Sequence, residues 1–267
     1  MLINDGGKIM QYDAIILAGG ESCGELKKIA PYDNEALIII GSYPMIYYVY
    51  RALRNSLLIR NIIISGPADS LRSIIPKEDN VFFVESGDNA IESFGHAFRL
   101  LQKKGMTDHL LIMPTDIPLI TTEAIDDFIY KCKEQEADFY YSITTKQVND
   151  IKFPGVSRTY VNLDEGTFTG GNLFLIKNEI VDKAMDIALQ LVERRKSPLA
   201  MARLFGLRLV LKYLTKSLSI IEVEKRFHEV VHIKGKAIIS AYAEVGVDVD
   251  KPSDLEIAQR YLAKISL

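Results

Sequence analysis

Residues 12–20 read Tyr-Asp-Ala-Ile-Ile-Leu-Ala-Gly-Gly, an apolar run that ends in two adjacent glycines. Such a run is typical of a buried strand that leads into a tight turn. Because glycine has no Cβ, a glycine turn after a first strand lets backbone N–H groups approach a phosphate closely. An ordinary strand-to-helix turn can have the same sequence, so the interpretation depends on what the rest of the chain adds.

Apolar runs alternate with helical patterns over the next 125 or so residues of the chain. Strands are expected at 12–18, 61–65, 80–84, 108–113 and 137–144, and helices at 44–55, 89–104 and 123–135. This alternation predicts βαβ units with right-handed crossovers, and therefore an α/β fold with a mostly parallel twisted sheet flanked by helices. Ligands of such sheets bind at the carboxyl ends of the strands, so Gly19, Gly20 and Asp116 are expected to meet there.

The second half of the chain has a different pattern. Strands are expected at 158–163 and 172–177, on either side of the segment Gly-Thr-Phe-Thr-Gly-Gly at 166–171. A helical elaboration is expected from about 178 to 228, with breaks near Ser197-Pro198 and at Gly206, before a strand at 236–245 and a closing helix at 252–264. We therefore expect a flexible leader over 1–11 and a single domain over 12–267.

Composition excludes several classes of protein. The 267 residues are 48% hydrophobic, enough for a full core, and carry a net charge of -3 without a polybasic arm, so nucleic acid is not expected as a partner. Apolar runs such as 36–40 are too short to span a membrane. The two cysteines do not form a disulfide framework, which favours a cytoplasmic setting. The oligomeric state is left open, and a homo-oligomer is possible.

Aspartates follow the predicted strands at two places. Asp116 follows the strand at 108–113, and Asp248 and Asp250 precede the closing helix. Carboxylates from two separate strand ends can hold Mg²⁺, which uses few protein ligands and takes the rest from phosphate and water. The alternative is that these are helix-capping or turn aspartates exposed to solvent.

Several segments in this order resemble the nucleotidyltransferase superfamily, which has the glycosyltransferase-A type fold. The resemblance is strongest to NTP transferase domains like those of molybdenum-cofactor guanylyltransferases. It covers about 12–145 and the last strand and helix. The segments that carry it are Leu17-Ala18-Gly19-Gly20, Ala36 to Gly41, Pro44-Met45-Ile46, Asp116 to Thr121 and Asp250 to Leu255.

The resemblance implies a division of roles along the site. It implies that Asp116 and Asp250 bind Mg²⁺, with Asp248 as a lesser candidate. It implies nucleotide binding by a glycine loop around the triphosphate and by a later loop at the base, namely Leu17, Ala18, Gly19, Gly20, Glu21, Ser86, Gly87 and Asn89. It places the acceptor beside Thr169, Gly170, Gly171 and Asn172.

The basic residues depart from the pattern of the superfamily. Its members usually carry an Arg after the glycines and a Lys before the Ala-Leu segment, whereas this chain has Glu35 at the Lys position and no Arg between 20 and 50. Transfer at a phosphorus atom builds negative charge that needs a cation besides Mg²⁺. Lys27 or Lys28 is therefore expected to supply the catalytic cation.

These observations predict a Mg²⁺-dependent nucleotidyltransferase. It would move a nucleotidyl group from a nucleoside triphosphate to a phosphorylated small-molecule acceptor and release pyrophosphate. The alternatives are a glycosyltransferase on the same fold, and a nucleotide-binding regulator that has lost catalysis. A further hypothesis assigns the acceptor to basic residues of the helical elaboration, namely Arg194, Arg195, Lys196 and Arg203.

Overall fold

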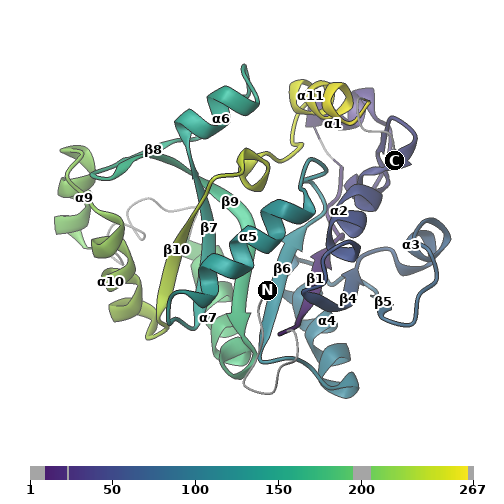
Figure 1. Cartoon of the computed structure of the whole chain (residues 1–267), viewed down its shortest axis with the longest axis horizontal. Helices are drawn as coiled ribbons and strands as arrows, with labels where there is room; N and C mark the ends of the chain where they lie inside the picture. The colour runs from purple at the N-terminus through teal and green to yellow at the C-terminus, as the bar shows by residue number, and fades with distance from the viewer. Residues whose placement is uncertain (1–9, 23, 195–205, 264–267) are drawn as a thin grey trace.

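A mixed sheet forms the centre of the computed structural model, which describes residues 10–22, 24–194 and 206–263. In these residues the strand order is β10-β7-β9-β6-β1-β4-β5, with β8 paired to the outer part of β9 (Figure 1). The strands are β1 Tyr12–Leu17, β4 Ile59–Ser65, β5 Val81–Val84, β6 His109–Pro114, β7 Phe139–Thr145, β8 Val161–Leu163, β9 Gly166–Lys177 and β10 Gly235–Ser240.

The sheet is mostly parallel, as the sequence predicts. β5, β4, β1 and β6 run parallel, as do β7 and β10, whereas β9 is antiparallel to β6, to β7 and to β8. The glycine-rich segment at 166–171 is part of β9 and not a connection between two elements, which corrects the expectation of a strand beginning at Asn172. β8 begins at Val161, three residues later than expected.

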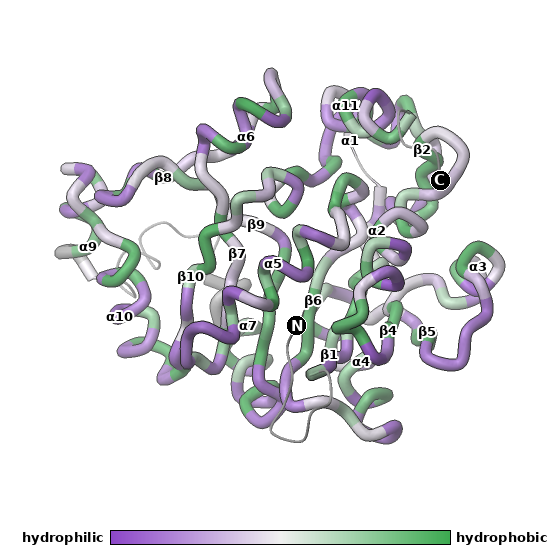
Figure 2. Tube along the Cα trace, viewed as in Figure 1, coloured by the Kyte–Doolittle hydropathy of each residue, from purple (hydrophilic) through white to green (hydrophobic). Residues whose placement is uncertain are grey.

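Helices cover both faces of the sheet because the side chains of each strand alternate between them. Ala14 and Ile16 belong to one buried cluster, with α2 (Met45–Arg54), α3 (Ala68–Ile74) and α5 (Thr122–Lys133). Ile15 belongs to a second cluster on the other face, with α4 (Ala90–Lys104) and the start of α7 (Val181–Arg194). Figure 2 shows hydrophobic colour along the central strands and hydrophilic colour in many outer turns.

The end of the chain returns to the first glycine turn. A third buried cluster joins α1 (Gly24–Ile29) and α11 (Pro252–Leu262) to the two-stranded ribbon of β2 (Ile39–Ile40) and β3 (Tyr43–Pro44). α1 and α11 lie together at one end of the molecule (Figure 1). The segment before α11, which carries Asp248 and Asp250, is thereby held beside the carboxyl end of β6.

The second half contains three helices besides α7 and α11 among the described residues. They are α6 (Lys146–Lys152), which the sequence analysis missed, α9 (Leu207–Leu214) and α10 (Ile220–Val231). The predicted break at Gly206 is confirmed, because this residue has a φ of 89° immediately before α9. The strand expected at 236–245 ends at Ser240, and a 3-10 helix occupies Ala243–Gly246. Two further 3-10 helices are Glu35–Leu37 and Asn178–Ile180.

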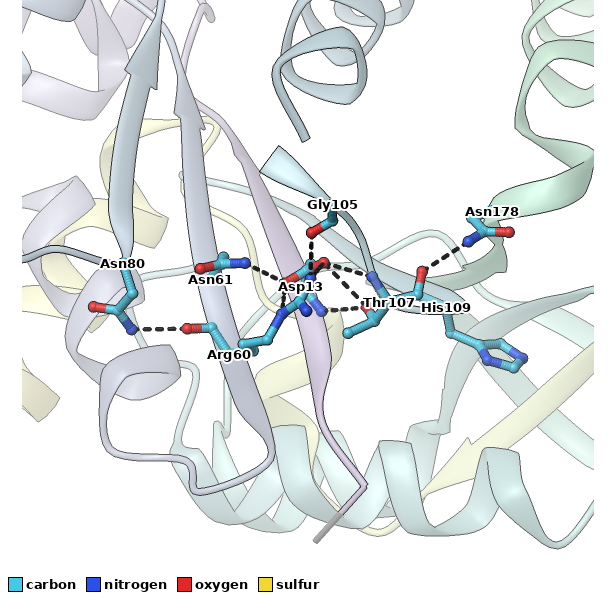
Figure 3. A network of polar contacts seen from close by, with 8 residues as sticks. All are labelled: Asp13, Arg60, Asn61, Asn80, Gly105, Thr107, His109 and Asn178. Carbon is cyan, nitrogen blue, oxygen red and sulfur yellow. Dashed lines mark hydrogen bonds and ion pairs between the residues drawn. The ribbon is translucent and has the colours of Figure 1, made fainter. Parts of the chain in front are cut away.

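A saturated polar network closes the amino end of the central strands (Figure 3). The Asp13 carboxylate is fully buried and accepts hydrogen bonds from Arg60 Nε and Nη2 at 3.0 and 2.7 Å. Asn61 Nδ2 and the Thr107 N–H also donate to it, at 2.9 and 2.8 Å. These donors offset the cost of burying the carboxylate, and the network joins β1, β4 and the approach to β6.

Among the described residues, no helix has the length and apolarity needed to cross a bilayer.

Candidate functional site

The glycine turn after β1 lies against two other loops. A Cβ on Gly19 would be 2.7 Å from Ser86 Cβ, and one on Gly20 would be 2.9 Å from Glu35 Oε2. Backbone bonds fix the turn, because the Glu35 N–H donates to the Gly20 carbonyl at 3.0 Å and Asn34 Nδ2 donates to the Ala18 carbonyl at 2.9 Å. A side chain at position 19 would therefore displace the Ser86 loop, whereas one at position 20 would meet only the movable end of the Glu35 side chain.

The first turn of α4 organises the loop at 85–89. The Gly87 N–H donates to Ser93 Oγ at 3.0 Å, and the Asn89 side chain accepts from the Ile91 and Glu92 N–H groups as the N-cap of α4. The helix expected at 89–104 is confirmed as Ala90–Lys104, with Asn89 as its N-cap residue and Gly105 as its C-cap residue. The structure thus places Ser86, Gly87 and Asn89 in a loop that faces the glycine turn.

A cleft of about 620 Å³ lies between these loops and the carboxyl end of β6. Its wall contains most of the residues expected to bind nucleotide, together with the predicted metal ligand Asp116. The lining residues are Leu17, Gly19, Gly20, Glu21, Glu35, Ser86, Gly87, Asp88, Asn89, Ala90, Ser93, Pro114, Thr115 and Asp116. Ala18 is buried and does not line the cleft.

Three carboxylates converge beside the cleft. One oxygen from each of Asp116, Asp248 and Asp250 lies within 4.8 Å of the others. The backbone brings them together, since the Val249 N–H donates to the Asp116 carbonyl at 2.7 Å. Asp116 Oδ1 is buried without a hydrogen-bond partner. An unsatisfied buried carboxylate oxygen in an acidic cluster fits a divalent cation, because the cation supplies the missing partner.

Burial and repulsion between neighbouring carboxylates raise the pKa values of Asp116, Asp250 and Glu35. The pKa of Asp116 is raised to about 7, first by burial and then by the charges of Asp248, Asp250 and Glu35. The pKa of Asp250 is raised by burial and by Asp248, although Arg158 opposes this effect. Burial, followed by the charges of Asp250 and Asp248, raises the pKa of Glu35. The cluster therefore has a strong tendency to bind protons or a cation.

The four residues expected beside the acceptor lie on β9, outside the wall of the cleft. A Cβ on Gly170 would overlap the Tyr141 hydroxyl, and one on Gly171 would overlap Ser142 Oγ. Thr169 is buried near Gly246, and Asn172 Nδ2 donates to the Val245 carbonyl at 3.2 Å. This part of β9 packs against β7 and the 3-10 helix at Ala243–Gly246. That helix leads directly to Asp248 and Asp250.

The structure does not bring the two predicted lysines into the cleft. Lys27 Nζ pairs with Asp33 at 3.0 Å, and Lys28 Nζ pairs with Glu25, all four side chains being substantially exposed. Among the described residues that line the cleft there is neither Lys nor Arg. Glu35, by contrast, lines the cleft. A catalytic role for either lysine therefore stays a prediction that requires these surface ion pairs to break.

Two residues beside the acidic cluster, Arg158 and Tyr141, were not predicted from the sequence. Arg158 Nη1 donates to Asp248 Oδ1, and Nη2 donates to the Asp248 carbonyl at 2.6 Å. The pKa of Tyr141 is raised by burial and by the charge of Asp248. No local motif marks either residue, because each reaches the acidic cluster from a distant part of the chain. The sole available signal was the need of a carboxylate cluster for a nearby cation.

The basic residues proposed to hold the acceptor remain untested. Arg195, Lys196 and Arg203 lie outside the described residues, and Arg194 is the last residue of α7. Within this segment the start of α7 packs beside α4, whereas α10 packs against the edge strand β10, and its Phe227 stacks on Phe139 with a ring separation of 6.2 Å.

The fold is an α/β fold with a mostly parallel mixed sheet flanked by helices, and the candidate site lies at the carboxyl edge of that sheet. Comparisons with known proteins and structures identify the family. The MobA-like NTP transferase domain matches residues 14–204. A hypothetical transferase from Thermus thermophilus is 33% identical, with a TM-score of 0.79 over 92% of this chain and 100% of that chain. No match was found among curated proteins.

More distant structures share the fold. The 4-diphosphocytidyl-2C-methyl-D-erythritol synthase of Anaerococcus prevotii is 14% identical, with a TM-score of 0.59 over 96% of this chain and 97% of that chain. A CMP:2-keto-3-deoxy-manno-octonic acid synthetase, determined with CTP, is 10% identical, with a TM-score of 0.59 over 95% of this chain and 99% of that chain. This chain belongs to the MobA-like NTP transferase domain family.

Gly19→Ala is expected to lower stability by about 1–3 kcal/mol, because its Cβ would overpack Ser86. Adding Ser86→Gly should restore most of the loss, since the nearest remaining side-chain atom, Ser93 Oγ, would be 3.5 Å away. Chemical denaturation of the two single variants and the double variant checks this. Equal stability of Gly19→Ala with and without Ser86→Gly would contradict the close-approach explanation.

Proposed function

We propose that this protein is a Mg²⁺-dependent nucleotidyltransferase that moves a nucleotidyl group from a nucleoside triphosphate to a phosphorylated small-molecule acceptor. Pyrophosphate is the second product. The observation that carries the proposal is the meeting of a glycine turn, a cleft of about 620 Å³ and three converging carboxylates at one edge of the sheet. Membership of the NTP transferase family supports the same conclusion.

In this proposal each group of residues binds a different part of the nucleotide or the metal ion. The glycine turn presents bare backbone to the phosphates, and Ser86, Gly87 and Asn89 face the rest of the nucleotide. Asp116 and Asp250 would hold Mg²⁺, which neutralises phosphate charge and orients the phosphates when bound. The protein then contributes chiefly by positioning the acceptor for attack in line with the leaving pyrophosphate.

The decisive experiment assays the purified protein with each of the four ribonucleoside triphosphates, Mg²⁺ and a panel of sugar phosphates and other small phosphate monoesters. Pyrophosphate release that requires both nucleotide and acceptor is the expected result. Release of a nucleoside diphosphate from a nucleotide sugar would instead identify a glycosyltransferase. Absence of Mg²⁺-dependent nucleotide binding would overturn the proposal.

One observation favours a second candidate, a nucleotide-binding regulator without catalysis. Glu35 lines the cleft while Lys27 and Lys28 lie in exposed ion pairs. A cleft that lacks a cation binds Mg²⁺-nucleotide but stabilises a developing negative charge poorly. Tight binding of nucleotide without pyrophosphate release across the acceptor panel would support the regulator, and replacement of Lys27 and Lys28 by Ala tests whether either lysine contributes.

Mg²⁺ affinity is expected to rise about tenfold between about pH 6 and pH 8, because the metal competes with a proton. The pKa of Asp116 is raised to about 7, so the carboxyl is mostly protonated at the lower pH and mostly ionised at the higher one. Calorimetric titration of Mg²⁺ at several pH values measures the profile.

A matched variant tests the cause of this pH dependence. The charge of Glu35 contributes to the raised pKa of Asp116, so Glu35→Gln should move the profile toward lower pH. Mg²⁺ affinity that is independent of pH in the wild-type protein would contradict the assignment of Asp116.

A further inference from the structure

Arg158 is a buried cation at the edge of the acidic cluster. It lies in the loop between α6 and β8, and its side chain is only 10% exposed. Two of its nitrogens bond to one residue, the carboxylate and the carbonyl of Asp248, so the direction of the guanidinium is fixed. Nε is buried and has no hydrogen-bond partner. A guanidinium held in this way retains donors for another ligand.

The ion pair distinguishes Asp248 from the two other aspartates. Asp248 Oδ1 already accepts from Arg158, whereas Asp116 Oδ1 is buried without a partner. A carboxylate engaged by a guanidinium is a poorer metal ligand, because the same lone pairs and the same charge are in use. This difference favours Asp116 and Asp250 as the metal ligands of the cluster and leaves Asp248 for a separate task.

The surroundings of Arg158 indicate that task. Arg158 is absent from the wall of the cleft that holds the glycine turn. Asp248 instead links it to Tyr141, whose pKa the Asp248 charge raises and whose hydroxyl lies over Gly170. Arg158 therefore meets the acidic cluster outside the wall of the cleft, through Asp248. Asp248 also lies near Tyr141, and hence near the β9 residues expected beside the acceptor.

We propose that Arg158, positioned by Asp248, binds the anionic group of the acceptor, a phosphate monoester. This inference rests on the proposed function and identifies the residue that selects the acceptor class. Arg158 contacts the acceptor, and Asp248 is a positioning residue that acts through Arg158. A planar, permanently charged guanidinium suits a phosphate because it donates two parallel hydrogen bonds.

The test first saturates the protein with Mg²⁺ and a non-hydrolysable nucleoside triphosphate analogue, then titrates inorganic phosphate as the probe by calorimetry. Arg158→Gln should weaken phosphate binding at least about tenfold, and Arg158→Lys should weaken it less, with affinity for the analogue within about twofold of wild type. Asp248→Ala should weaken phosphate binding, and Asp248→Asn, which still accepts hydrogen bonds, should restore part of it.

A second measurement uses Mn²⁺ alone, with spin-resonance detection. Asp250→Asn should lose at least about tenfold in Mn²⁺ affinity, and Asp248→Asn no more than about threefold. Equal losses in these variants, unchanged phosphate binding by Arg158→Gln, or loss of analogue binding by Arg158→Gln would each overturn the inference. Failure of the wild-type protein to bind any analogue would instead refute the proposed function, so the two failures are distinguishable.

Discussion

Asp116→Asn is expected to abolish Mg²⁺-dependent nucleotide binding and to lower turnover by at least about 1,000-fold. The carboxylate is the deepest group of the acidic cluster, and its buried Oδ1 has no partner within the protein. An amide at this position removes one negative charge and can turn an N–H₂ group toward the metal. Titration of Mg²⁺ in the presence of a triphosphate analogue measures the loss directly.

Two controls separate this effect from unfolding. The pKa of Asp116 is raised to about 7, so its ionised form destabilises the metal-free protein. This loss of stability grows as the pH rises toward about 7 and is fully present above it. Asp116→Asn should therefore melt at a higher temperature than wild type at pH 8 without metal. Asp33→Asn, at an exposed carboxylate paired with Lys27, should leave Mg²⁺ affinity unchanged. Retained Mg²⁺ dependence in Asp116→Asn would refute the assignment.

Asp13→Ala is expected to cost about 3–5 kcal/mol of unfolding free energy, the largest stability effect predicted for a single residue here. The substitution leaves Arg60, Asn61 and the Thr107 N–H without their shared acceptor at the amino end of the sheet (Figure 3). Such donors cost more when their partner is lost than the bonds contribute in net terms. Urea denaturation at neutral pH measures the change.

The matched control is Asp69→Ala, which removes an exposed partner of Arg72 and should cost less than about 1 kcal/mol. Asp13 lies at the opposite end of β1 from the glycine turn, so nucleotide affinity below the melting transition should be retained. Similar losses for the two variants would show that the buried network contributes no more than a surface ion pair.

The elements that the sequence predicted well have strong local signals. The apolar run before Gly19 identifies β1, and Asn89 with Gly105 marks both ends of α4. The start of β9 was harder to predict from the sequence, because Gly170 and Gly171 interrupt the alternation of its side chains. The reason for these glycines is tertiary, since the hydroxyl groups of Tyr141 and Ser142 occupy the space of a Cβ.

In the candidate site, too, the residues with a local or topological signal were predictable and those placed by tertiary contacts were not. The meeting of Asp116 and Asp250 was predicted from the carboxyl edge of the sheet, although Asp250 follows a 3-10 helix and not directly a strand. The positions of the Lys27 and Lys28 side chains were not predictable, since nothing in the local sequence shows which way α1 turns its charged face. Arg158 was also out of reach, because its partner Asp248 is 90 residues away in sequence. Ion pairs between distant loops depend on the completed fold.

The antiparallel strand β9 has a consequence for synthesis of the chain on the ribosome. β6 and β7 precede it in sequence yet pair with each other only through it, as β9 lies between them in the sheet. When residues 10–145 have emerged, the edge of β6 still has unpaired N–H and C=O groups. The nascent chain therefore has an open, apolar edge until β9 is translated, and slow codons or a stall in this interval should favour aggregation.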